Sequence, residues 1–172
     1  MKPSVILIIK KLLARLILRQ CEMNNIDKIF ERTSAEVWKE REEWIDATIE
    51  EFEVGSYLVS EHSTALFFDM RRAYCAGAWI SVIVMAISVM DSHFRETESG
   101  DNRINTAKLL NEYYGGDDVE WLRKLRNRYV HLDLTNTFLE MDTWFKNYNQ
   151  LEADAKRAML ITIKAFFLNP GT

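Results

Sequence analysis

The longest apolar stretch of the sequence spans Thr64 to Phe94 and reads TALFFDMRRAYCAGAWISVIVMAISVMDSHF. Apolar side chains would cover almost every side of a helix built on this stretch, which is the pattern of a helix buried in the centre of a protein. Small residues near its middle, from Ala73 to Ala78, would let a neighbouring helix approach closely. We therefore expect one long central helix, with Cys75 as a buried thiol.

The whole chain contains few residues that break helices, with 2 Pro and 6 Gly among 172 residues. Hydrophobic residues make up 48% and charged residues 28%, which is the composition of a folded globular protein. A chain of this length fits one domain and can bury a substantial core. These observations favour an all-α fold, a single-domain bundle of four to five helices.

Apolar residues at three- to four-residue spacing predict the other helices. The polar stretch Arg95–Arg103 predicts a loop. The helices expected outside the central one are Ile26–Phe52, as one helix or as two with a break near Thr33–Ser34, Ile104–Tyr114, Asp118–Leu132 and Asp142–Phe167.

Residues 1–22 form a basic and apolar N-terminal segment, which we separate from a helical bundle over residues 23–172. The apolar run from Val5 to Leu18 is interrupted by two lysines and one arginine, too soon for the roughly 20 apolar residues of a membrane span. The same charges argue against a secretory signal, although attachment to a membrane surface stays open. The segment is either an extra packing helix or an extension upstream of a natural start at Met23.

The formal net charge of −4 argues against a surface coated with cations for non-specific nucleic-acid binding, but it allows a local basic patch. Cys21 and Cys75 lie far apart and form no metal-binding spacing, which favours a reducing, cytoplasmic setting. His62, His93 and His131 are too scattered to suggest a metal site, and no phosphate-binding glycine motif is present. The sequence thus predicts no metal and no cofactor.

The helix expected from Asp118 to Leu132 has two contrasting sides. Asp117 or Asp118 can cap its N-terminus, where acidic groups are favoured. At about 100° per residue, apolar side chains gather on one side and should face the core. These core residues are Leu122, Leu125, Tyr129 and Leu132.

The opposite side of this helix is polar and basic. Asn127 and His131 lie on a face turned away from the core, and Arg126 lies at the border. A solvated basic face is the ordinary interpretation of such a pattern. The cations of this short segment are Arg123, Lys124, Arg126 and Arg128.

The segment Leu125-Arg126-Asn127-Arg128-Tyr129-Val130-His131 resembles the R-x4-6-H motif of the HEPN superfamily, small helical-bundle proteins in which a polar residue often follows the Arg. The long helix before it, rich in small residues, and the amphipathic helix after it are similar to that family's pattern. The resemblance implies a metal-independent endoribonuclease whose motif residues meet across a homodimer interface.

In that interpretation His131 transfers protons to and from the RNA, Arg126 stabilises the charge on the scissile phosphate, and Asn127 orients His131 or the phosphate. Because Arg126 and His131 lie about 140° apart on one ideal helix, two copies facing each other could surround one phosphate where a single copy could not. The remaining cations, Arg123, Lys124 and Arg128, would bind RNA.

The implied partners are RNA, a second copy of the chain, and an antitoxin or other regulatory protein, as for a toxin or phage-defence effector. HEPN toxins that are regulated by nucleotidyltransferase antitoxins resemble R-x4-H-x-Y, whereas this sequence has Asp133 at the Tyr position. Asp91 and His93 either cap or solvate the end of the central helix or lie beside the cleft that the motif residues would form. The alternatives are a non-catalytic module that binds nucleotide, RNA or a protein, and a purely structural bundle.

Overall fold

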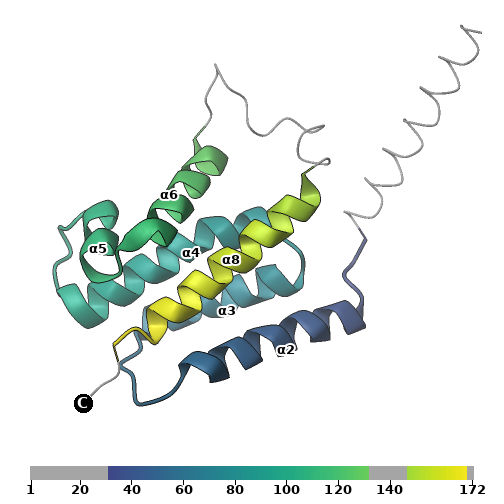
Figure 1. Ribbon diagram of the computed structural model, residues 1–172, viewed down its shortest axis with the longest axis horizontal. Coiled ribbons are helices and arrows are strands. Elements are labelled where there is room, and N and C mark those ends of the chain that lie inside the picture. Colours follow the sequence, from purple (N-terminus) through teal and green to yellow (C-terminus); the bar gives the residue numbers. More distant parts are fainter. Residues whose placement is uncertain (1–30, 132–146, 170–172) are drawn as a thin grey trace, which may run out of the picture. The chain divides into compact units, whose positions relative to one another are not determined.

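The computed structural model describes residues 31–131 and 147–169 (Figure 1). The chain divides into two compact units, Met1–Arg32 and Thr33–Thr172, and the described helices belong to the second. The segment 1–22 and its boundary at residue 23 fall outside the described residues.

The all-α prediction is confirmed, because the described residues contain helices and no strand. Their six α-helices exceed the predicted four to five. The helices are α2 (Ala35–Phe52), α3 (Glu61–Cys75), α4 (Trp79–Phe94), α5 (Thr106–Tyr113), α6 (Gly116–Val130) and α8 (Tyr148–Phe166), with a π-helical turn (Arg95–Ser99) after α4.

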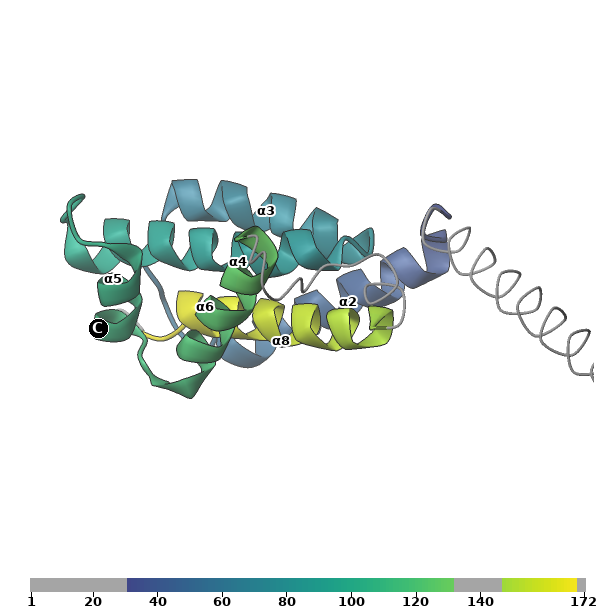
Figure 2. The same ribbon diagram turned by 90° about the horizontal axis from the view of Figure 1, so that it is seen from above.

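Helix α4 is the centre of the bundle and packs against α3, α5, α6 and α8 (Figures 1 and 2). It is apolar on nearly all sides, as the sequence predicts, because neighbours surround it. Among the described residues, none of the helices combines the length and apolar character needed to cross a membrane. The α4 side chains that are 0% exposed are Val82, Ile83, Ala86, Val89, Met90 and Phe94.

The expectation of one helix from Thr64 to Phe94 is wrong, because the chain reverses at Gly77. This residue has φ +77°, a left-handed conformation that glycine adopts without a Cβ clash. The Ala78 N–H donates to the Ala73 carbonyl oxygen at 2.8 Å, which closes the turn. The small residues therefore form a tight connection between α3 and α4, which then pack on each other.

Gly77→Ala is expected to lower the free energy of unfolding by more than the about 1–2 kcal/mol typical of left-handed backbone. An added Cβ would lie 3.3 Å from Arg41 Nη1 and 3.4 Å from Tyr148 Oη. Arg41 cannot move away freely, because Nη1 donates to the Cys75 carbonyl oxygen at 3.0 Å. Gly100→Ala is the matched control, since Gly100 has φ +61° and open space around it. Urea unfolding measures both variants. Equal losses of unfolding free energy in Gly77→Ala and Gly100→Ala would contradict the expectation that Arg41 and Tyr148 crowd the added Cβ at Gly77.

Helices α2 and α8 run parallel, although they come from opposite ends of the bundle sequence. Arg41 and Glu152, both in the early turns, form an ion pair of 3.4 Å. Near the carboxyl ends, Lys164 Nζ lies 5.5 Å from the Phe52 ring centroid. Helix α4 runs in the same direction as α8 (Figure 1), so three carboxyl ends gather at one end of the bundle.

The remaining helix boundaries follow from local chemistry. Helix α2 begins directly after the predicted break near Thr33–Ser34, because Ser34 caps it and its Oγ accepts a hydrogen bond from the Val37 N–H. The part of the predicted helix from Ile26 to residue 30 lies outside the described residues. The stretch Arg95–Arg103 is only partly a loop, since it starts with the π-helical turn. The last helix is described from Tyr148, and the predicted start at Asp142 falls outside the described residues.

Candidate functional site

Helix α6, which carries the R-x4-H motif, runs from Gly116 to Val130 instead of Asp118 to Leu132. Its N-cap is Gly115, with φ +68°, so the predicted capping by Asp117 or Asp118 is wrong. Both aspartates lie in the first turn instead, where their negative charge still favours the positive end of the helix.

The predicted core side of α6 is confirmed for the residues that are described. Leu122 and Leu125 are buried, as is Val119 one turn earlier. Tyr129 is half-buried against the core, and burial raises the pKa of its phenol to about 12. Leu132 lies outside the described residues.

Two contacts to α8 fix the rotation of α6. The Arg157 guanidinium lies 4.0 Å from the centre of the Trp121 ring. The same guanidinium donates to Asp118 Oδ1 at 2.6 Å. Stacking and ion pairing through one planar group constrain both the position and the angle of the helix. The polar side of α6 is thereby held away from α8.

Arg126, Asn127 and His131 lie at the end of α6. Arg126 is half-buried and its Nη1 donates to Asn127 Oδ1 at 3.2 Å. The Asn127 carbonyl oxygen accepts from the His131 N–H at 2.9 Å, and the backbone of His131 is already extended, with φ −104° and ψ 119°. Asn127 therefore bonds to the Arg126 side chain and to the His131 backbone. The ring of His131 is exposed, as predicted.

The other predicted cations of α6 point in different directions. Arg123 and Lys124 share Glu120, through contacts of 2.7 Å and 3.3 Å. Arg123 reaches the cleft described next, whereas the Lys124 side chain is 67% exposed and does not line it. Arg128 is exposed near the carboxyl end of the helix. The structure thus brings Arg123 together with Arg126 and leaves Lys124 apart.

A cleft of about 420 Å³ lies beside the polar side of α6. Helix α4 contacts both α3 and α6 and lines the cleft between them, while α5 supplies a further wall. Two of the motif residues, Arg126 and Asn127, line this cleft, but His131 of the same chain does not. The lining residues are His62, Leu66, Ile87, Ser88, Asp91, Ser92, Thr106, Ala107, Arg123, Arg126 and Asn127.

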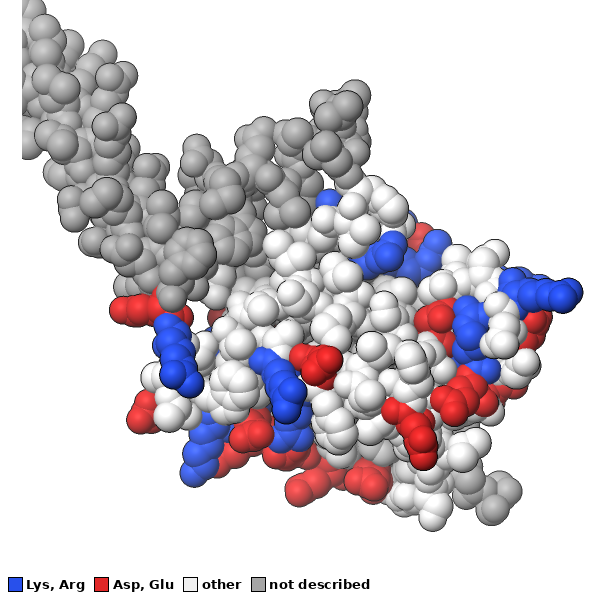
Figure 3. All heavy atoms as spheres, turned by 180° about the vertical axis from the view of Figure 1, so that it is seen from behind, with Lys and Arg blue, Asp and Glu red and all other residues white. Residues whose placement is uncertain are grey.

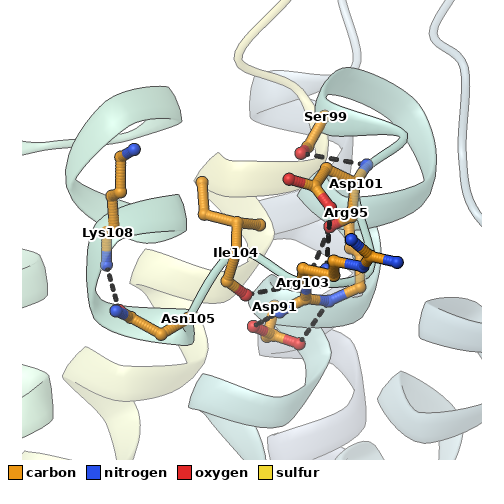
Figure 4. Close-up of polar contacts among 8 residues, drawn as sticks. All are labelled: Asp91, Arg95, Ser99, Asp101, Arg103, Ile104, Asn105 and Lys108. Atoms are coloured by element: carbon orange, nitrogen blue, oxygen red, sulfur yellow. Dashed lines mark hydrogen bonds and ion pairs between the residues drawn. The ribbon is translucent and has the colours of Figure 1, made fainter.

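Asp91 lies in the last turn of α4 and lines the cleft, which is one of the two places that the sequence left open for it. Its carboxylate accepts two hydrogen bonds from Arg95, at 2.7 Å and 3.2 Å (Figure 4). Arg95 also donates to the carbonyl oxygens of Asp101 and Ile104, so it ties the end of α4 to the segment leading into α5. The negative charge of Asp91 is therefore largely neutralised within the cleft wall.

His93 is not part of the cleft. It is 4% exposed, and its ring packs against Phe94 and Phe166 with centroid distances of 5.2 Å and 4.8 Å. Its Nδ1 has no hydrogen-bond partner among the described residues. Burial lowers the pKa of His93, partly opposed by the charges of Glu98 and Glu96. The ring is thus a neutral part of the core.

Stability should fall as the pH falls from the ordinary titration range of histidine toward the lower pKa of folded His93, because unfolded His93 takes up a proton more readily than the folded residue. The contribution of neutral His93 to the free energy of unfolding is fully present above the pKa of the unfolded residue. It is lost as the pH falls through the lower pKa of the folded residue. Urea unfolding of the wild type and of His93→Gln between neutral and mildly acidic pH checks this. A His93→Gln variant with the full pH dependence of the wild type would refute it.

On the face shown in Figure 3, acidic and basic side chains are interspersed around an uncharged centre. Within residues 31–131 and 147–169, no three His, Cys, Asp or Glu side chains are placed to hold a metal ion. Arg123 and Arg126 bring two guanidinium groups to one cleft, and guanidinium groups are well suited to bind a phosphate.

Sequence reasoning did not connect His62 with the motif helix. His62 lies in the first turn of α3, and it reaches the cleft only because the chain reverses at Gly77 and packs α3 on α4. Local spacing carries no signal of that reversal. The hydroxyls of Ser88, Ser92 and Thr106 were missed because they reach the cleft through the packing of α4, α5 and α6, which local spacing does not show either.

Comparison with known proteins adds no relative to this description: no family model, curated protein or solved structure matches the chain.

Proposed function

We propose that this protein is a metal-independent endoribonuclease of the HEPN type. The observation that supports this most directly is that Arg126 and Asn127 line a cleft while the exposed His131 follows directly after their helix. A guanidinium that binds phosphate and an imidazole that transfers protons are the groups that RNA cleavage needs. Asn127 lies between them in the sequence and bonds to both residues.

In the proposed reaction the ribose 2′-oxygen attacks the adjacent phosphorus and loses its proton to His131. A bond from phosphorus to the 2′-oxygen forms, and the bond to the 5′-oxygen of the next nucleotide breaks. The leaving 5′-oxygen takes up a proton from solvent water, and the upstream product carries a 2′,3′-cyclic phosphate. Arg126 offsets the negative charge that grows on the phosphate oxygens in the transition state.

A second copy of the chain is part of this proposal. His131 does not line the cleft of its own chain, so a partner's α6 facing the cleft across a twofold axis would supply the missing group. The side chains of Asn127, Val130 and His131 are exposed and available for that contact.

The test is cleavage of single-stranded RNA by the purified full chain in the presence of EDTA. We expect products with a cyclic phosphate and no cleavage when the scissile position carries a 2′-deoxy sugar, because the attacking hydroxyl is then missing. Light scattering should give the mass of a dimer. Loss of cleavage on adding EDTA would refute the metal-independent reaction, and a monomer that cleaves would refute the shared site.

A non-catalytic module that binds nucleotide, RNA or a protein is the second candidate function. It is favoured by the absence of His131 from the cleft lining of its own chain, since the cleft then offers binding groups without the proposed proton carrier. RNA binding without cleavage would favour this second candidate.

As a ribonuclease the protein would act in the cytoplasm as a toxin or phage-defence effector, held in check by an antitoxin or other regulatory protein.

A further inference from the structure

Exposed apolar side chains gather at one end of the bundle, where α2 leads into the connection to α3 and where α8 ends (Figure 1). Four of the seven strongly exposed large apolar side chains of the described residues lie there. The rings of Tyr57 and Phe167 meet edge to face at 5.0 Å, which joins the connection to the end of α8. Single exposed apolar residues are ordinary, but a group of them indicates an interaction surface. The group, which we call the apolar patch, consists of Val54, Leu58, Val59 and Leu168, which are 80%, 71%, 40% and 42% exposed.

A pocket of about 110 Å³ adjoins the apolar patch, because Val59 belongs to both. Side chains of α2, α3 and α8 form its walls. Its volume is well below the roughly 300–1,000 Å³ of sites for small ligands. It is closer to the engineered apolar cavity of about 150 Å³ that holds one benzene ring. The pocket therefore fits one apolar side chain better than a cofactor or a metabolite. Its other lining residues are Ile49, Thr64, Phe67, Ile163, Phe166 and Phe167.

Two hydrogen bonds hold carboxylates at the border of the apolar patch. The hydroxyl of Ser60, which is next to the patch in the sequence, donates to the Glu96 carboxylate. At the other border, Asn169 Nδ2 donates to Glu98 Oε1 at 3.0 Å. Both glutamates belong to the π-helical turn after α4 and are exposed. These bonds thus bring two negative charges from the end of α4 to the patch.

The ends of the neighbouring helices add two more exposed carboxylates. Glu53 is the C-cap of α2 and Glu61 begins α3, so they stand on either side of the connection that carries most of the patch. Lys164, a cation of this end, is turned to the Phe52 ring, with Nζ 5.5 Å from the centroid. The rim of the apolar patch is therefore negatively charged, and it favours a positively charged partner.

The acidic rim decides which kind of partner suits the apolar patch. Anionic lipid surfaces and nucleic acids would be repelled by the same carboxylates. A protein segment with one large apolar side chain among Lys or Arg residues would match both the pocket and the rim. The patch and its pocket share no residue with the cleft lining, so neither function proposed for the cleft accounts for them.

We propose that the apolar patch binds a basic segment of a partner protein, which inserts one large apolar side chain into the pocket and places Lys or Arg side chains against the glutamate rim. The apolar contact supplies most of the affinity, because exposed ion pairs contribute little. The charges select which segments bind. This binding does not depend on whether the protein cleaves RNA, because none of the residues involved lines the cleft.

Nuclear magnetic resonance titration of the isotope-labelled full chain with a synthetic peptide tests this. In the probe, one central leucine is flanked on each side by two lysines, with alanines between them. At low salt we expect saturable binding of one peptide per chain, with shifts of the Val59 and Leu168 amide resonances and none at Asn127. Replacing the leucine by alanine should weaken binding by about 10-fold or more, and replacing the lysines by glutamates should abolish it. Added salt should weaken binding as well.

Variants of the protein locate the binding site. Val59→Ser should weaken binding of the leucine peptide by about 5-fold or more, because a wall of the pocket becomes polar. Val37→Ser is the matched control, since Val37 is 38% exposed in the first turn of α2, at the other end of that helix, and should bind like the wild type. The double change Glu53→Gln and Glu98→Gln should weaken binding several-fold at low salt. Glu43→Gln, which removes an exposed carboxylate farther back on α2, should not.

Three outcomes would overturn the proposal. The first is that the leucine peptide does not bind, or binds no better than the alanine peptide. The second is binding to vesicles of phosphatidylcholine and phosphatidylglycerol that Val59→Ser abolishes, which would assign the patch to a membrane surface. The third is a dimer that Val59→Ser dissociates, which would assign the patch to a second copy of the chain. The amide shifts of the wild type are independent of how the variants fold.

Discussion

Replacing His131 or Arg126 by alanine is expected to slow RNA cleavage by about 10²–10⁴-fold, because a positioned proton carrier and a donor to the developing charge each contribute on that scale. The His131 ring is exposed, and its one described hydrogen bond is made by the backbone, which alanine keeps. The loss in His131→Ala should therefore be one of chemistry and not of folding.

Arg126 needs a finer series, because its side chain is half-buried. Arg126→Lys keeps the positive charge but loses the planar fork that grips two phosphate oxygens, so we expect a rate between those of the wild type and Arg126→Ala. Arg72→Ala, outside the cleft, should cleave like the wild type. Circular dichroism melts of each variant check the fold.

A mixture of Arg126→Ala chains and His131→Ala chains tests whether two copies share the site. If each site takes Arg126 from one chain and His131 from the other, half of the randomly mixed dimers carry one intact site. The rate should then recover to about a quarter of the wild-type rate. A mixture as inactive as its components would place both residues in the same chain.

Phe94→Ala is expected to lower the free energy of unfolding by about 3–5 kcal/mol, the usual loss when a large buried aromatic side chain is truncated. Phe94 is 0% exposed at the end of α4. Its ring lies 6.4 Å from the rings of both Tyr113 and Tyr114, which connect it to α5 and its C-cap. The cavity would thus open where α4 and α5 meet.

Phe68→Ala is the matched control for this loss. Phe68 has the same side chain but is 57% exposed on α3, so its truncation should change stability by about 0.5 kcal/mol or less. Urea unfolding followed by circular dichroism measures both variants. Similar losses would mean that Phe94 is less closely packed than its burial indicates.

The fold class could be predicted because it depends on local pattern, the scarcity of Gly and Pro and the spacing of apolar residues. The reversal at Gly77 could not, since both halves of Thr64–Phe94 are apolar enough to continue a helix. One signal was available: Arg71 pairs with Asp46 and Glu42 of α2, and an arginine in the middle of an apolar run suits a surface helix better than a buried one.

The candidate site, too, could be predicted only in the part that depends on local pattern. The sides of α6 followed from helical geometry, so Leu122 and Leu125 were placed in the core and Asn127 on the polar side correctly. His62 in the cleft and His93 in the core were not predicted, because the position of each depends on how separate helices pack. The roles of Arg126, Asn127 and His131 remain predictions.

The parallel arrangement of α2, α4 and α8 has an electrostatic consequence for the cleft. Each helix carries the equivalent of roughly −0.5 charge at its carboxyl end, from backbone dipoles that add along the axis. The last two turns of α4 line the cleft, and the carboxyl end of α8 lies beside that of α4, where Phe166 meets His93. The first turns of α3 and α5 also line the cleft, and the positive ends of these two helices oppose the negative end of α4. Because the backbone contributions oppose one another, Arg123 and Arg126 supply the main attraction for a phosphate, and this attraction should weaken as added salt screens the charges.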